Sequence, residues 1–234
     1  MKVGSLLKLL LFLTLCAAII PAIVFYSRIK KIEKIIQTTT SSPHWHSRID
    51  LFRNDPIDEN AIILLGDDMI EHFKPALLSN DRIVNRGIAG DFTKSILLRL
   101  DEITLSHPEK VFIMAGINDI REKMPLFMIS HYIKKIVNQI NTKTPETKIY
   151  IQSILPVAVR DQFFDPDQQL NNKIQRMNNK LSKLCTRKNI TYIDLYPLFE
   201  KDGELKQSLR GDMNGINDKG YRIWSEYLRQ FVEK

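Results

Sequence analysis

The stretch Ala61-Ile62-Ile63-Leu64-Leu65-Gly66-Asp67-Asp68 decides how this 234-residue chain folds. Its five apolar residues, 61–65, predict a buried strand. The strand ends at Gly66, and an amphipathic segment follows. A strand-to-helix turn of this kind lies at the carboxyl edge of a sheet, where open α/β folds bind their ligands. We therefore expect Asp67 and Asp68 to lie at a binding edge.

The rest of the chain repeats this alternation of strands and helices. Further strands are predicted at 82–85, 110–115, 148–154 and 190–194. Apolar residues at helical spacing predict helices at 92–103, 126–140, 170–184 and 221–231. Five strands separated by helices predict a three-layer α/β/α sandwich around a parallel sheet.

The N-terminal segment is of a different kind. Residues 9–26 are apolar and carry no charge, and this segment is just long enough to cross a bilayer. We expect an uncleaved single-pass anchor rather than a signal peptide, because no small-residue cleavage site follows. The predicted organisation is an anchor with a juxtamembrane helix at 1–37, a polar linker at 38–43 and a folded domain at 44–234.

Charge and cysteine content narrow the possible functions. The net charge is +7, and residues 1–40 hold six basic residues and one acidic residue, which leaves +2 for residues 41–234. The folded part is thus close to neutral, and we expect no nucleic-acid partner. Cys16 and Cys185 form no metal-ligating cluster. His44, His46, His107 and His131 are interpreted as surface residues. His72, one helical turn after Asp68, is interpreted as an exposed or helix-capping residue, with a role in the chemistry as the minor alternative.

Four short segments at the ends of predicted elements resemble the sequence blocks of the SGNH/GDSL hydrolase family. These segments are Gly66-Asp67-Asp68, the run Asn-Arg-Gly-Ile-Ala-Gly-Asp at 85–91, Gly-Ile-Asn-Asp at 116–119, and Asp-Met-Asn-Gly at 212–215. Each alone is a weak signal, but four in this order, from about residue 44 to the C-terminus, are specific. The resemblance implies a flavodoxin-like SGNH fold with strand order 2-1-3-4-5, the order that right-handed crossovers also favour.

The resemblance also implies roles, and two positions depart from the family pattern. Asp68 stands where the family has its nucleophilic serine, and Gly215 stands where it has its histidine base. The implied oxyanion hole is made by Gly90 and Asn118, and Asp212 is the implied triad acid. Asp68 has no proton to give up and Gly215 has no side chain, so the serine–histidine mechanism cannot operate.

Three hypotheses follow from these departures. The first is a membrane-anchored pseudoenzyme, with its domain outside the cytoplasm, that binds a glycan, an acylated ligand or a protein partner and needs no cofactor. The second is an active esterase or acetylesterase with a non-standard residue set. The third is a divalent-cation site at an acidic sheet edge, since hard cations prefer oxygen ligands; the first hypothesis predicts no metal. The ligand contacts expected under the first are Asp67, Asp68, Gly90, Asp91, Asn118, Asp119 and Asp212.

Overall fold

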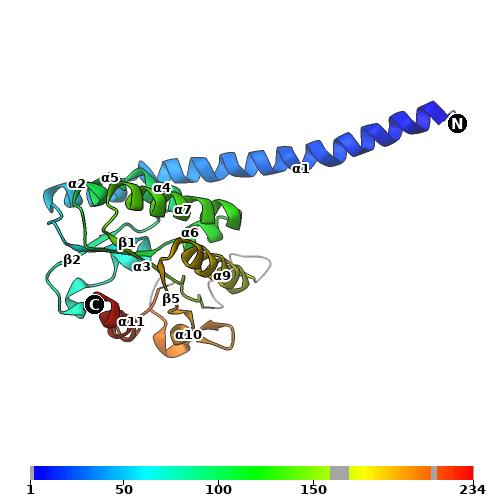
Figure 1. The fold of residues 1–234 in the computed structure, drawn as a ribbon. Helices are drawn as coiled ribbons and strands as arrows, with labels where there is room; N and C mark the ends of the chain where they lie inside the picture. The colour runs from blue at the N-terminus through cyan, green and yellow to red at the C-terminus, as the bar shows by residue number, and fades with distance from the viewer. Residues whose placement is uncertain (1–2, 159–168, 212–214, 234) are drawn as a thin grey trace. The chain divides into compact units, whose positions relative to one another are not determined.

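The computed structural model describes residues 3–158, 169–211 and 215–233, and the chain divides into two compact units, Met1–Thr38 and Thr39–Lys234. The first element is α1 (Val3–Thr40; Figure 1), and Pro21 lies inside it. Its segment Leu11–Thr40 is long and apolar enough to cross a membrane. The side chains described in its apolar part are exposed, for example Phe12 at 61% and Val24 at 61%.

The second unit is built on five parallel strands in the order β2-β1-β3-β4-β5. The strands are β1 (Ile62–Gly66), β2 (Ile83–Gly87), β3 (Lys110–Met114), β4 (Lys148–Gln152) and β5 (Thr191–Ile193). In the register, Gly66 at the end of β1 lies beside Gly87 of β2 and Met114 of β3. The predicted five-stranded parallel sheet and its strand order are confirmed, and the ends of three neighbouring strands lie together.

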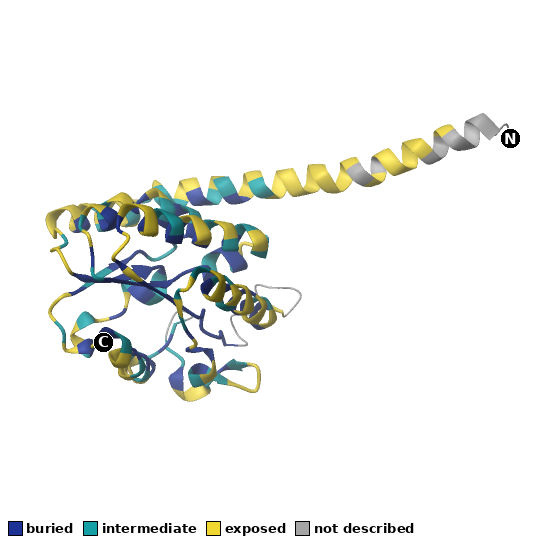
Figure 2. Cartoon of the chain, viewed as in Figure 1, coloured by how far each residue is buried: buried dark blue, intermediate teal, exposed yellow. Residues whose placement is uncertain are grey.

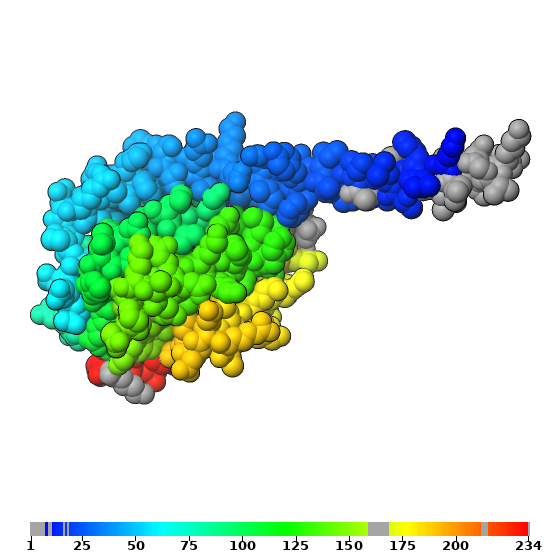
Figure 3. All heavy atoms as spheres, turned by 45° about the horizontal axis from the view of Figure 1, so that its top comes forward, coloured from blue at the N-terminus to red at the C-terminus, as the bar shows by residue number. Residues whose placement is uncertain are grey.

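Helices cover both faces of this sheet and make a three-layer sandwich (Figure 1). The helices are α2 (Pro43–Asn54), α3 (Asp68–Glu71), η1 (Pro75–Leu78), α4 (Thr93–Leu98), α5 (Asp101–Leu105), α6 (Ile117–Arg121), α7 (Leu126–Lys143), α9 (Leu170–Lys188), α10 (Tyr196–Phe199), η2 (Gln207–Leu209) and α11 (Asp218–Val232). A small hairpin, β6 (Glu200–Lys201) with β7 (Glu204–Leu205), follows α10. In Figure 3, α7 and α9 lie side by side on one outer face of the domain.

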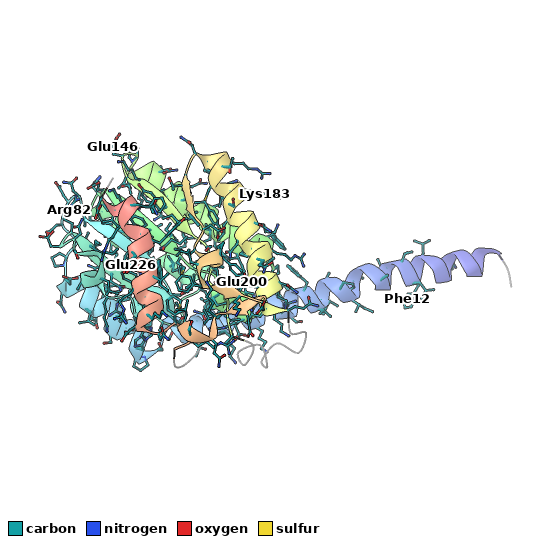
Figure 4. The ribbon with its side chains drawn as sticks, turned by 90° about the horizontal axis from the view of Figure 1, so that it is seen from below. Phe12, Arg82, Glu146, Lys183, Glu200 and Glu226 are labelled. Carbon is teal, nitrogen blue, oxygen red and sulfur yellow. The ribbon has the colours of Figure 1, made fainter. Side chains whose placement is uncertain are left out.

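Alternation along the strands supplies a core on each face of the sheet. Ile62 and Leu64 of β1 pack toward Trp224 of α11 in one core. Ile63 and Leu65 are equally buried and point to the opposite face. The strands are therefore buried on both sides while the outer helix faces are exposed (Figure 2). Glu226 on α11 and Lys183 on α9 lie on such outer faces (Figure 4).

Two boundaries differ from the sequence prediction. The single helix expected over 92–103 is divided into α4 and α5, with Arg99 and Leu100 between them. Arg99 turns its guanidinium inward, where it donates to the carboxylate of Asp91 and to the backbone carbonyls of Gly66 and Arg86. This inward turn coincides with the break between the two helices. The segment expected as a linker at 38–43 is helical through Thr40, because no helix-breaking residue precedes Ser42-Pro43.

Candidate functional site

Asp68 holds the central position of the site. It is the first residue of α3, and only Asp67 separates it from β1. Its Oδ2 accepts two hydrogen bonds. The backbone N–H of Gly90 donates at 2.9 Å, and the side-chain Nδ2 of Asn118 donates at 2.8 Å. Both distances are those of charge-assisted hydrogen bonds. Asp68 Oδ1 has no hydrogen bond to any other residue that the structure describes.

The sheet brings these three groups together. Asp68 follows β1, Gly90 follows β2, and Asn118 lies in α6 after β3, so neighbouring strands deliver them to one edge. Gly90 has φ +81, a backbone conformation in which a side chain would be strained. At Gly66, a Cβ atom would come within 2.1 Å of the carbonyl oxygen of Met114. The glycines therefore permit the turn after β2 and the close approach of β1 to β3.

Asp67 lies beside Asp68 but is far more buried, at 1% exposure. Its Oδ1 accepts a hydrogen bond from the backbone N–H of Met69 at 3.4 Å, whereas its buried Oδ2 has no partner among the described residues. Burial, with the charge of Asp68 adding to it, raises the pKa of Asp67 well above the ordinary value. Burial likewise raises the pKa of the neighbouring Tyr221 hydroxyl.

Asp91 and Asp119 lie under the site rather than in it. Asp91 is fully buried, and it pairs with Arg99 Nε at 2.8 Å and accepts from Ser95 Oγ at 2.7 Å. Asp119 is also fully buried and accepts from both the N–H and the Oγ1 of Thr93, at 3.0 and 2.6 Å. Burial raises the pKa of Asp119 to about 6, although the bonds from Thr93 oppose the shift. Both carboxylates are buried, and neither is among the described residues that line the cavity beside Asp68.

Helix α2 supplies residues that the sequence prediction missed. His44 Nε2 lies 3.0 Å from Glu71 Oε2, and that oxygen also accepts the N–H of Ala89 in the loop before Gly90. Trp45 Nε1 donates to Asp91 Oδ1 at 3.1 Å, and Arg48 donates to the carbonyl of Gly87 at 2.9 Å. The loop that carries Gly90 is thus held from α2 and from Glu71. Ser42-Pro43 is a typical helix start and predicts α2. No sequence signal identifies the residues that α2 contacts elsewhere in the chain.

A cavity of about 560 Å³ opens beside Asp68. Its polar lining comes from His44, Asp67, Asp68, Glu71, His72 and Arg121. Its apolar lining comes from Met69, Ala89, Met114, Ala115, Ile117, Leu205, Ile216, Tyr221 and the segment 154–157. The size is typical of small-molecule sites. A larger hollow of about 1060 Å³ along the outer edge of β2 does not include Asp68.

Of the positions implied for the base and the triad acid, the structure describes Gly215. Gly215 lines the cavity, and its carbonyl accepts the N–H of Gly211 at 3.0 Å. Asp212 lies outside the described residues. His44 and His72 are exposed, as predicted, yet both lie on the cavity wall. Within the described ranges, no group of three His, Cys, Asp or Glu residues could hold a metal ion, so nothing there supports the divalent-cation hypothesis.

An open parallel sheet of order 2-1-3-4-5, with polar groups converging beyond the ends of β1, β2 and β3, defines an open α/β domain with a candidate binding edge. The model of the GDSL-like lipase/acylhydrolase family matches residues 64–223. The chain belongs to this family, and the resemblance seen in the sequence is confirmed.

The chain is also similar to individual proteins. Platelet-activating factor acetylhydrolase IB subunit alpha2 of Rattus norvegicus is 29% identical over 198 residues, covering 80% of this chain and 83% of that protein. N-acylneuraminate cytidylyltransferase of Escherichia coli is 25% identical over 80% of this chain, which spans only 44% of that protein. A GDSL-like lipase structure from Bacteroides thetaiotaomicron has a TM-score of 0.67 and 21% identity, covering 74% of this chain and 88% of that chain.

Proposed function

We propose that this chain is a membrane-anchored member of the family that binds a small ligand and does not hydrolyse esters. One observation carries the proposal: Asp68 Oδ2 accepts hydrogen bonds from both Gly90 N–H and Asn118 Nδ2. In the family pattern these are the two donors to the oxyanion. The carboxylate of the chain therefore occupies the place where negative charge would develop on a substrate.

The charge of Asp68 at the oxyanion position supports loss of hydrolysis. Catalysis of acyl transfer requires donors aimed at the developing oxyanion and free to receive it. Here Gly90 N–H and Asn118 Nδ2 already donate to the carboxylate of Asp68. This carboxylate would repel a substrate oxyanion that approached the same two donors. Asp68 also provides no hydroxyl nucleophile, and Gly215 provides no imidazole. The missing hydroxyl and the missing imidazole both impair the same step, the attack of a nucleophile on the ester carbonyl.

Retention of the cavity supports ligand binding. A hollow of about 560 Å³ with an apolar wall fits a small molecule better than a large protein surface. It lies at the carboxyl edge of the sheet, where this class of fold binds ligands.

The test is steady-state hydrolysis of short-chain aryl esters and acetylated sugars by the full chain. We expect wild-type turnover equal to that of a control protein. Turnover above that control, abolished in Asp68→Ala, would identify Asp68 as a catalytic residue and overturn the proposal.

A second candidate is hydrolysis that uses a different base, and the pairing of His44 with Glu71 at 3.0 Å on the cavity wall favours it. Such a pair can orient an imidazole as a general base. This candidate predicts wild-type turnover that is lost in His44→Ala. The same assay therefore separates the two candidates.

The anchor is part of the proposal. We propose that residues 9–26 span the membrane once and that the domain faces away from the cytoplasm. The length and apolar composition of this segment support the first statement. Protease treatment of intact cells tests the second: digestion of residues 39–234 is expected, and protection until the cells are lysed would reverse the orientation.

A further inference from the structure

We propose that the cavity beside Asp68 binds a protonated amine carried on an apolar chain, with the ammonium group at Asp68 and the chain along the 154–157 wall. This inference rests on the proposed function, because it assigns the ligand class of the same cavity.

The polar end of the cavity lies at Asp68. Asp68 Oδ2 already uses Gly90 N–H and Asn118 Nδ2, so a ligand carbonyl has no access to these donors. Asp68 Oδ1 has no donor among the described residues and can only accept. A ligand group placed against it must therefore donate a hydrogen bond, and a cation does so most strongly.

A second carboxyl group, that of Asp67, lies buried next to Asp68. Asp67 lines the same cavity at 1% exposure, and its Oδ2 lacks a partner within the described part of the chain. A buried polar atom without a partner is costly. A ligand with several N–H bonds, such as a primary ammonium group, could satisfy Asp67 and Asp68 together, because its positive charge favours the ionised, accepting form of Asp67.

Much of the remaining cavity wall is apolar. The segment Ile154-Leu155-Pro156-Val157 is buried against solvent and lines the cavity, with Leu205 and Ile216 also on the wall. An alkyl chain gains free energy by contact with such a surface. The cavity therefore suits a molecule with one cationic end and one apolar end.

The basic side chains on the wall define the rival ligand. His44 lies against Glu71, which also faces Arg48 at 3.9 Å. His72 Nδ1 lies 2.8 Å from the carbonyl of Asp68. Arg121 also lines the cavity, and no ion pair joins it to a described residue. If Arg121 rather than Asp68 governed binding, an anionic amphiphile would be preferred.

The experiment is calorimetric titration of the full chain in lipid nanodiscs, with empty nanodiscs as blank. The probes share a six-carbon chain: hexylamine, which is protonated near pH 7 as lysine is, hexanol and hexanoate. We expect hexylammonium to bind roughly tenfold more tightly than the other two. Asp68→Asn keeps an oxygen for Gly90 and Asn118 but removes the charge, so it should abolish this preference.

Matched variants complete the test. Asp81→Asn removes an exposed carboxylate outside the cavity and should leave the preference unchanged. Arg121→Gln should strengthen hexylammonium binding, which keeps the test informative if Asp68→Asn fails to fold. Equal or tighter binding of hexanoate, a preference that survives in folded Asp68→Asn, or no binding of any probe would overturn the inference. Ester hydrolysis by the wild type would instead overturn the proposed function, whichever probe binds.

Discussion

The side-chain amide of Asn118 joins Asp68 to the loop after β2. Its Nδ2 donates to Asp68 Oδ2 at 2.8 Å and to the backbone carbonyl of Asp91 at 3.1 Å. An amide NH2 group has two N–H bonds to donate, so both are used within the domain. Asn118 thus bonds the chain itself, in the place where the family pattern has it bond a substrate.

This arrangement predicts energetic coupling between Asn118 and Asp68. Asn118→Ala should lower the free energy of unfolding by about 1–3 kcal/mol, because a carboxylate loses a hydrogen bond. In an Asp68→Ala background the same change should cost less, giving a coupling energy of about 0.5–3 kcal/mol. Denaturation of the four proteins measures it, with Asp81→Ala as an uncoupled control. Additive effects of the two changes would contradict the pairing.

The buried pair of Asp91 and Arg99 should be far more important for stability than an exposed pair. Asp91→Ala leaves the Arg99 guanidinium buried without its charge partner, and the expected loss is about 3–5 kcal/mol. Asp101 pairs with Lys143 at 2.7 Å on the surface, and Asp101→Ala should cost less than about 1 kcal/mol. Thermal unfolding compares the two variants. Similar melting temperatures would show that the buried pair is not a stabilising contact.

Buried carboxyl groups give the domain a predictable dependence on pH. Burial raises the pKa of Asp119 from 3.8 to about 6, so between these values the folded state keeps a proton that the unfolded state has lost. The unfolded state then binds fewer protons, and the free energy of unfolding falls as the pH rises through this window. The raised pKa of Asp67 acts in the same direction.

Asp119→Asn should remove the contribution of Asp119 and flatten this slope. The measurement is the unfolding midpoint from about pH 4 to pH 7, the range set by the two pKa values. Asp81→Asn, a change of the same kind at an exposed site, should keep the wild-type slope. An unchanged slope in Asp119→Asn would mean that Asp119 is ionised in the folded state throughout this range.

The sheet could be predicted from the sequence because its strands are short apolar runs separated by helical stripes. The apolar run before Gly66 predicts β1, and four family-like segments place the converging groups at the sheet edge. The approach of Asp68 to Gly90 and Asn118 follows from that topology. The two hydrogen bonds that Gly90 and Asn118 donate to the Asp68 carboxylate could not be predicted. They depend on the rotamer of Asp68 and on interatomic distances, which a sequence pattern does not contain.

The burial of individual polar side chains could not be predicted from the sequence. Asp91 and Asp119 look like ligand contacts because they follow strands, yet Arg99 and Thr93 bond them beneath the site. The contacts of Trp45 and Glu71 join segments far apart in the chain. Hydrophobic periodicity describes neighbours along one element, and it says nothing about such partners.

Restoring both lost groups should restore hydrolysis better than restoring one. In Asp68→Ser the donors Gly90 N–H and Asn118 Nδ2 become free to receive an oxyanion, but no imidazole is present to take the serine proton. Asp68→Ser combined with Gly215→His adds that base on the cavity wall, three residues after Asp212, the position of the triad acid in the family pattern. We expect the single variant to match the wild-type background and the double variant to exceed it in steady-state ester hydrolysis. Gly215→His alone is the matched control and should stay inactive, because Asp68 still occupies the donors. Activity of the double variant no higher than that of Gly215→His would mean that more than these two residues separates this site from a working hydrolase.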